Sequence, residues 1–88
     1  MRVSFKRAFI KDLRKIPANL KVAIEAFAFE EATSVEGLEG LANIQPITGH
    51  SGYFRKRFGD YRVGFKAGGD EIIFYRVLHR KDIYRYFP

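Results

Sequence analysis

The 88-residue sequence contains no cysteine and no tryptophan, and it has only two histidines. Without cysteine the chain cannot form a disulfide framework, a thiolate zinc site or a thiol nucleophile. With so few histidines we expect neither a metal site nor a cofactor held by one. The lack of disulfides fits a reducing cytoplasm.

Long hydrophobic runs are also missing. Apolar runs such as Ala26–Phe29 are far too short to cross a bilayer. No apolar segment of the kind found in secretion signals follows Met1 and Arg2. We therefore expect a soluble cytoplasmic protein with no membrane partner.

What the sequence does contain is enough apolar material for a core. Hydrophobic residues make up 47% of the chain and aromatic residues 16%, which argues against disorder. The length predicts one small domain, residues 1–88. A domain of this size buries only about 60–65% of its unfolded surface, so we expect modest stability.

The net charge of +6 is unevenly distributed. Residues 1–52 carry seven Lys or Arg against six Asp or Glu, whereas residues 53–88 carry nine against four. A basic surface attracts nucleic acid, an anionic membrane or an acidic protein. A charge that only aids solubility is the alternative, but it does not explain why the excess is local.

The first half of the chain predicts a strand and two helices. Residues 2–6 alternate as a strand with Val3 and Phe5 on one face. A short helix from Arg7 ends before Pro17. Residues 18–32 form a second helix, with Asn19 as its expected N-cap. This helix has two apolar stripes, so we expect it between the sheet and the first helix; the second stripe contains Val22, Ala26 and Phe29.

The second half predicts a meander. Residues 33–52 form a glycine-rich connector with space for one helical turn. Strands are expected at 53–58, 61–66 and 71–78, separated by tight turns, and 82–87 form a last helical turn. The fold class is therefore α+β: a helical hairpin packed on a small, mainly antiparallel four-stranded sheet, in the order β-α-α-β-β-β plus the C-terminal turn.

Three arginines gather on the first hairpin. Alternation places Arg55 and Arg57 on one face of their strand, and Arg62 joins them across the turn. Guanidinium groups on one face repel each other, and a sheet does not need them to fold. A polyanionic ligand is the economical explanation.

The motifs FKRAFIKDLRKIP, YFRKRFGDYRVGF and VLHRKDIYRYF, taken with this element order, resemble the RelE/ParE superfamily of toxins from bacterial and archaeal toxin–antitoxin pairs. The resemblance covers essentially the whole chain. RelE-like members cut messenger RNA in the ribosomal decoding site, whereas ParE-like members poison DNA gyrase and lack the catalytic set.

The resemblance implies five catalytic positions, all of them filled here: Arg55 and Arg57 before the turn, Arg62 after it, Arg80 at the end of the last strand and Tyr84 in the tail. It favours a metal-independent mRNA endonuclease without a cofactor. Further RNA contacts are expected from Lys56, Arg76, Lys81 and Arg85. Its implied partners are a RelB-like antitoxin, in a hetero-oligomer, and mRNA with ribosomal RNA in the A site.

This chain departs from the family at two positions. Arg55 and Arg57 replace a Lys/Lys pair, and an arginine cannot act as a base. Lys56 occupies a position that is usually apolar, so it either snorkels or lines a second part of the site. Tyr84 then remains as proton acceptor or stacking platform, or else it is a tail aromatic packed on the sheet. His79 is expected on the opposite face from Arg80 in a structural role.

The alternatives left open are a gyrase-inhibiting toxin and a catalytically degenerate protein that only binds its antitoxin. Arg62 has a further alternative, a surface ion pair with Asp60 or Asp82.

Overall fold

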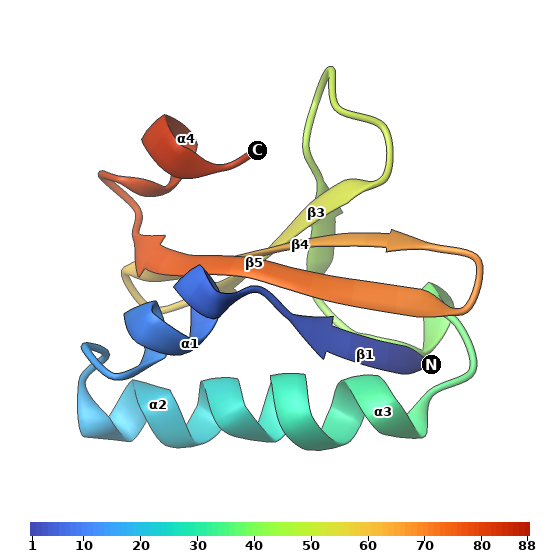
Figure 1. Ribbon diagram of the computed structural model, residues 1–88, viewed down its shortest axis with the longest axis horizontal. Coiled ribbons are helices and arrows are strands. Elements are labelled where there is room, and N and C mark those ends of the chain that lie inside the picture. Colours follow the sequence, from blue (N-terminus) through green and yellow to red (C-terminus); the bar gives the residue numbers. More distant parts are fainter.

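The computed structural model describes all residues, 1–88, and contains one mixed sheet of five strands in the order β1-β5-β4-β3-β2 (Figure 1). β1 runs parallel to β5, and the other neighbouring strands are antiparallel. The strands are β1 Arg2–Phe5, β2 Ile44–Pro46, β3 Tyr53–Phe58, β4 Tyr61–Gly68 and β5 Glu71–His79.

The prediction of four strands is wrong by one, because the connector contributes β2. This strand has three residues and pairs with β3, placing Gln45 opposite Arg55. Three residues ending in proline give no readable alternation, and β2 is defined only by its partner. The connector also contains the expected helical turn, a 3-10 turn at Leu38–Gly40.

The predicted meander is confirmed closely. β3 has its expected bounds, while β4 and β5 extend a little further. Gly59 and Gly69 supply the positive φ angles of 58° and 59° at the two hairpin turns. A bulge between β4 and β5 occurs at Gly64/Phe65. It changes the alternation along β5, so Phe74 and Val77 both face the core.

The helices of the first half of the chain cover one face of the sheet. α1 spans Arg7–Leu13, and the long helix consists of α2 Ala18–Glu25, the π-helical segment η1 Ala26–Glu31 and α3 Ala32–Ser34. The prediction that Asn19 is the N-cap is wrong. The helix starts at Ala18 with Pro17 before it, whose fixed φ of −53° already suits the first turn.

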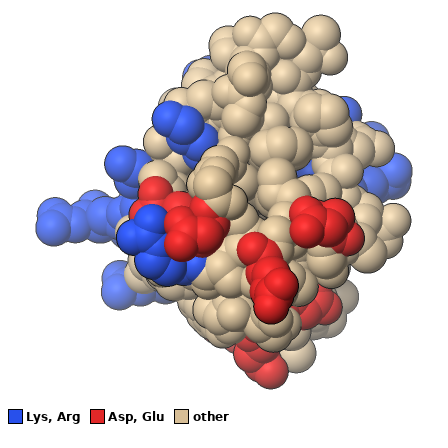
Figure 2. Space-filling view, turned by 90° about the vertical axis from the view of Figure 1, so that its right-hand side faces the viewer, with Lys and Arg blue, Asp and Glu red and all other residues tan.

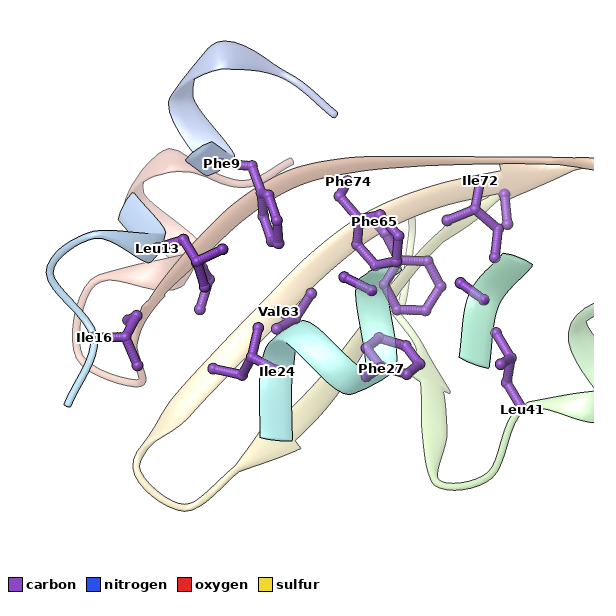
Figure 3. Close-up of a cluster of buried hydrophobic side chains, with 14 residues drawn as sticks. Phe9, Leu13, Ile16, Ile24, Phe27, Leu41, Val63, Phe65, Ile72 and Phe74 are labelled. Atoms are coloured by element: carbon purple, nitrogen blue, oxygen red, sulfur yellow. The ribbon is translucent and has the colours of Figure 1, made fainter. Parts of the chain in front are cut away.

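The helix-side core is built on aromatic side chains (Figure 3). Phe27 and Phe74 lie with ring centroids 5.7 Å apart, and Phe9 and Phe65 each lie within 5.5 Å of Phe74. The second apolar stripe is not covered as expected, since Val22 is 69% exposed. The reason is that α1 packs against β5, at the part of its edge that β1 leaves open.

The other face of the sheet has a smaller apolar cluster of its own. Ile47, Ile83 and Phe87 are its buried members, and the rings of Tyr53 and Tyr75 pack against them. Ile83 belongs to α4 Ile83–Tyr86, which with the following residues lies across this face (Figure 1). None of the helices has the length and hydrophobicity needed to cross a membrane.

Candidate active site

A cleft of about 630 Å³ opens beside this smaller cluster. Eight residues line it, and all five residues predicted for the site are among them: Asn43, Gln45, Arg55, Arg57, Gly59, Arg62, Arg80 and Tyr84. The lining contains four guanidinium groups and no carboxylate. The structure therefore brings together five predicted side chains that the sequence separates by up to 29 positions.

Strand pairing explains how three of these arginines meet. Arg57 is the direct cross-strand partner of Arg62, while Arg55 lies opposite Gly64. Residues opposite each other on antiparallel strands point to the same face, as do residues two apart on one strand. Arg80 follows β5, and its backbone N–H donates to the Asp60 carbonyl at 2.7 Å, which fixes the strand end to the β3–β4 turn.

Backbone and side-chain acceptors hold the arginines in the cleft. Arg62 Nη1 donates to the carbonyls of Gly59 at 2.8 Å and Tyr61 at 3.0 Å. Arg55 Nη2 donates to Gln45 Oε1 at 2.9 Å. The alternative role of Arg62, an ion pair with Asp60 or Asp82, is wrong, because neither pair forms. Asp60 instead faces Arg80 at 3.7 Å, a distance and exposure at which a pair contributes little.

The electrostatics of the cleft favour an anion. Burial of Arg62, reinforced by the nearby charges of Arg57, Arg80 and Arg55, lowers the pKa of its guanidinium. Burial is the larger cause of this lowering, and repulsion from the neighbouring guanidinium groups adds to it. An anion placed among the four groups would relieve that repulsion.

Tyr84 completes the cleft from the tail. Its ring lies 5.7 Å from Arg55 Cζ, and the side chain is 56% exposed. The alternative in which Tyr84 packs on the sheet is therefore wrong, because its neighbours Ile83 and Phe87 do that packing. Its phenol is the one hydroxyl group in the lining and can donate or accept a hydrogen bond there.

Two polar lining residues were missed from the sequence, Asn43 and Gln45. Both depend on β2, whose position could not be read locally. Asn43 has a positive φ of 57°, a conformation that asparagine tolerates better than most residues. An isolated Asn-Ile-Gln tripeptide gives no signal that separates this arrangement from an ordinary loop.

Two of the four further cations expected to contact RNA do not line the cleft because they are engaged elsewhere. Lys56 lies on the helix side of the sheet, where its Nζ donates to the Ala42 carbonyl at 2.7 Å and sits 5.1 Å from the Phe27 ring. Of the two alternatives for Lys56, the structure therefore shows snorkelling and not a place in the cleft lining. Arg76 forms a two-pronged ion pair with the buried carboxylate of Asp12, at 2.7 and 3.0 Å.

The other two, Lys81 and Arg85, are exposed beside the tail. They do not line the cleft, but they flank Tyr84 in the sequence.

His79 lies apart from the cleft, as expected. Its ring packs edge-on against Tyr61 at 5.4 Å, and its Nδ1 accepts from the Lys81 backbone N–H at 3.1 Å. Both contacts are structural.

Comparison with known proteins shows the family of this chain. The family model described as the ParE toxin of type II toxin–antitoxin system, parDE, matches residues 3–84. The chain is 44% identical over 89 residues to Toxin RelE3 of Methanocaldococcus jannaschii, covering the whole of both chains. It is 31% identical over 86 residues to Toxin RelG of Mycobacterium tuberculosis, covering 94% of each.

Solved structures give the same answer. The toxin of the RelB–RelE antitoxin–toxin complex from Methanococcus jannaschii superposes with a TM-score of 0.80 at 42% identity, covering 96% of this chain and 98% of that one. The RelBE2 complex from Mycobacterium tuberculosis follows, with a TM-score of 0.69 at 28% identity and coverage of 90% and 96%. The chain therefore belongs to the RelE/ParE superfamily and is a RelE-like toxin of a type II toxin–antitoxin system.

Proposed function

We propose that this toxin is a ribosome-dependent endoribonuclease that cleaves mRNA through attack of a 2′-hydroxyl on the adjacent phosphodiester. The observation that carries the proposal is the cleft, in which four arginines and one tyrosine from three separate parts of the chain surround a space of about 630 Å³. A scissile phosphate is the anion that suits this lining.

Arg55, Arg57 and Arg62 stabilise the phosphorane. Its charge grows in the transition state, and preorganised planar donors aimed at phosphate oxygens then bind more strongly than in the ground state. Removing one such donor typically costs about 10²–10³ in rate. Arg80, at the end of β5, acts electrostatically on the phosphate or on the departing 5′-oxygen.

Tyr84 accepts the proton of the 2′-hydroxyl. Its ring lies 5.7 Å from Arg55 Cζ, which places the phenol among the cleft arginines. The same ring offers a face on which an unstacked base can stack. No step of this mechanism uses a metal ion.

The partners are inferred from the basic cleft together with apolar side chains exposed elsewhere on the molecule. A RelB-like antitoxin, in a hetero-oligomer with the toxin, is supported by the solved relatives, which are RelB–RelE and RelBE2 complexes. A flexible acidic chain with apolar residues would match both the basic cleft and the exposed side chains of Val22, Phe29 and Tyr86. Lys81 and Arg85 are available to ribosomal RNA, and the site of action is the cytoplasmic ribosome.

Gyrase inhibition is the second candidate, because the matched family model has the ParE description. One experiment separates the two. Purified toxin is incubated with programmed ribosomes and the 5′ ends of the message are mapped, while gyrase supercoiling is assayed in parallel. Codon-phased cuts that Arg62→Ala and Arg80→Ala abolish support the nuclease. Arg2→Ala is the matched control, since Arg2 pairs with Asp70 outside the cleft.

Intact messages together with blocked supercoiling would show that the protein is a gyrase toxin instead. Intact messages with unaffected gyrase would leave only an antitoxin-binding role.

A further inference from the structure

The tail that carries Tyr84 has little structure of its own. α4 is four residues long, and a helix this short is not stable by itself in water. Its internal contacts are single backbone bonds, such as the Phe87 N–H to the Ile83 carbonyl at 2.8 Å. Something outside α4 must therefore hold Tyr84 at the cleft.

Phe87 provides several of these contacts. It is 1% exposed although it lies one residue from the C-terminus, and its ring packs within 5.7 Å of Tyr53 and 5.6 Å of Tyr75. Together with the buried Ile83, it brackets the exposed Tyr84 on both sides. The two apolar residues thus fasten the segment from which the phenol projects.

The Phe87 ring packs against Gly64, at the middle of β4. A Cβ at Gly64 would lie 2.8 Å from Cγ of Phe87 and closer still to two other ring carbons, so no side chain fits there. Gly64 is the cross-strand partner of Arg55 and is two residues from Arg62 on the same face. The missing side chain of Gly64, next to Arg55 and Arg62, therefore leaves the space in which the Phe87 ring packs.

We propose that Phe87, seated on Gly64, is a positioning residue that holds Tyr84 against the cleft arginines. This inference rests on the proposed nuclease function but adds two residues outside the cleft lining to it. Phe87 does not touch the substrate. It acts through Tyr84, because reacting groups must lie close to their productive geometry, and a displacement of about 1 Å can cost about 10²-fold in rate.

The test compares single-turnover cleavage of ribosome-bound message by Phe87→Ala in two backgrounds. In the parent chain we expect a loss of up to about 10²-fold in the rate at saturation, with the half-saturating ribosome concentration unchanged because the arginines remain in place. In a Tyr84→Phe background the same change should cost nothing further, since the group being positioned is already gone. Ile72→Ala, a truncation at an equally buried helix-side position, is the matched control and should retain the parent rate where it is folded.

Gly64→Ala should displace the Phe87 ring, and with it the tail, without changing Phe87 itself. It should slow cleavage as Phe87→Ala does, and adding Phe87→Leu should restore part of the rate, because the smaller side chain makes space for the new methyl group. The rate of hydrogen exchange at the Phe87 amide reports how firmly the tail is held, because this N–H donates to the Ile83 carbonyl. Exchange should be faster in Gly64→Ala than in the parent chain.

Several outcomes would overturn the proposal. These are a parent-like rate in folded Phe87→Ala, an equal loss in both Tyr84 backgrounds, or a protected Phe87 amide in Gly64→Ala. If the parent chain cuts no RNA, the proposed function fails, while the exchange measurement still decides whether Gly64 seats the tail.

Discussion

The two faces of the sheet are built on different principles. The helix face is filled by fully buried side chains such as Phe9, Phe27 and Phe74. The opposite face has only a small apolar cluster around Ile47 and Phe87, and beside it a cleft lined by four arginines. One face supplies stability through burial. The other keeps like charges together, which does not help folding and is the feature on which the proposed function rests.

The cleft also differs from the end of the molecule that carries the N-terminus and the β4–β5 turn (Figure 2). At that end Asp and Glu residues gather over the lower part, and Lys and Arg occur beside them or project at the margins. Arg2 and Asp70 there form an ion pair of 2.9 Å. Mixed charges neutralise one another, whereas the cleft lining has no carboxylate to do so.

Breaking the helix face should have the largest effect on stability. Phe74→Ala removes a ring that contacts Phe5, Phe9, Phe27 and Phe65, and it should cost about 3–5 kcal/mol of unfolding free energy. Urea unfolding followed by circular dichroism measures this. A loss below about 1 kcal/mol would mean that the core does not depend on this aromatic cluster.

Breaking the cleft should separate activity from stability. Arg62→Ala should lower cleavage by about 10²–10³-fold, because one phosphate donor is lost. The unfolding free energy should change by no more than about 0.5 kcal/mol, since the repulsion from the neighbouring arginines disappears with the charge. Single-turnover cleavage and urea unfolding of the same preparation test both. A large loss of stability would show that this face is structural after all.

Breaking the ion pair between Asp12 of α1 and Arg76 of β5 should lower the unfolding free energy by an intermediate amount. Asp12 is 8% exposed and accepts hydrogen bonds from Arg76 and from the Val77 backbone N–H at 3.1 Å. Asp12→Ala should cost about 2 kcal/mol, since hydrogen bonds to a charged group are lost, while Arg76 is partly exposed and can be rehydrated. Thermal unfolding measures the loss. Asp70→Ala is the exposed control, and equal shifts for both variants would contradict the importance of burial.

The smallest effect should come from the exposed charge pair at the far end. The hydrogen bond and charge of Arg2 lower the pKa of Asp70 below its ordinary value of 3.8. A depressed carboxyl pKa stabilises the fold above the ordinary value, and this contribution is lost as the pH falls through the folded-state pKa. Asp70→Asn should therefore slightly lower stability at neutral pH, but not at a pH below the folded-state value. A difference that persists in strong acid, or that added salt does not reduce, would contradict this origin.

Part of the site follows from the residue pattern of the first hairpin. Alternation along residues 53–66 places Arg55, Arg57 and Arg62 on one face, and the register confirms that placement. The positions of Arg80 and Tyr84 in the cleft were expected only from the family resemblance, because no local pattern connects a strand end and a tail with a distant hairpin. Their chemical roles stay predictions.

The sequence alone determined that Arg55, Arg57 and Arg62 share a strand face and that Ile24 and Phe27 face the core, because the periods of 2 and 3.6 residues are local properties of the backbone. Only the tertiary structure decided the rest. It added β2 with Gln45, and it directs the Lys56 ammonium to the Ala42 carbonyl on the helix side of the sheet. It also pairs Arg76 with Asp12 and packs the Phe87 ring on Gly64 beside the cleft. Each of these depends on a contact between segments far apart in the chain, and such contacts leave no periodic signal in either segment.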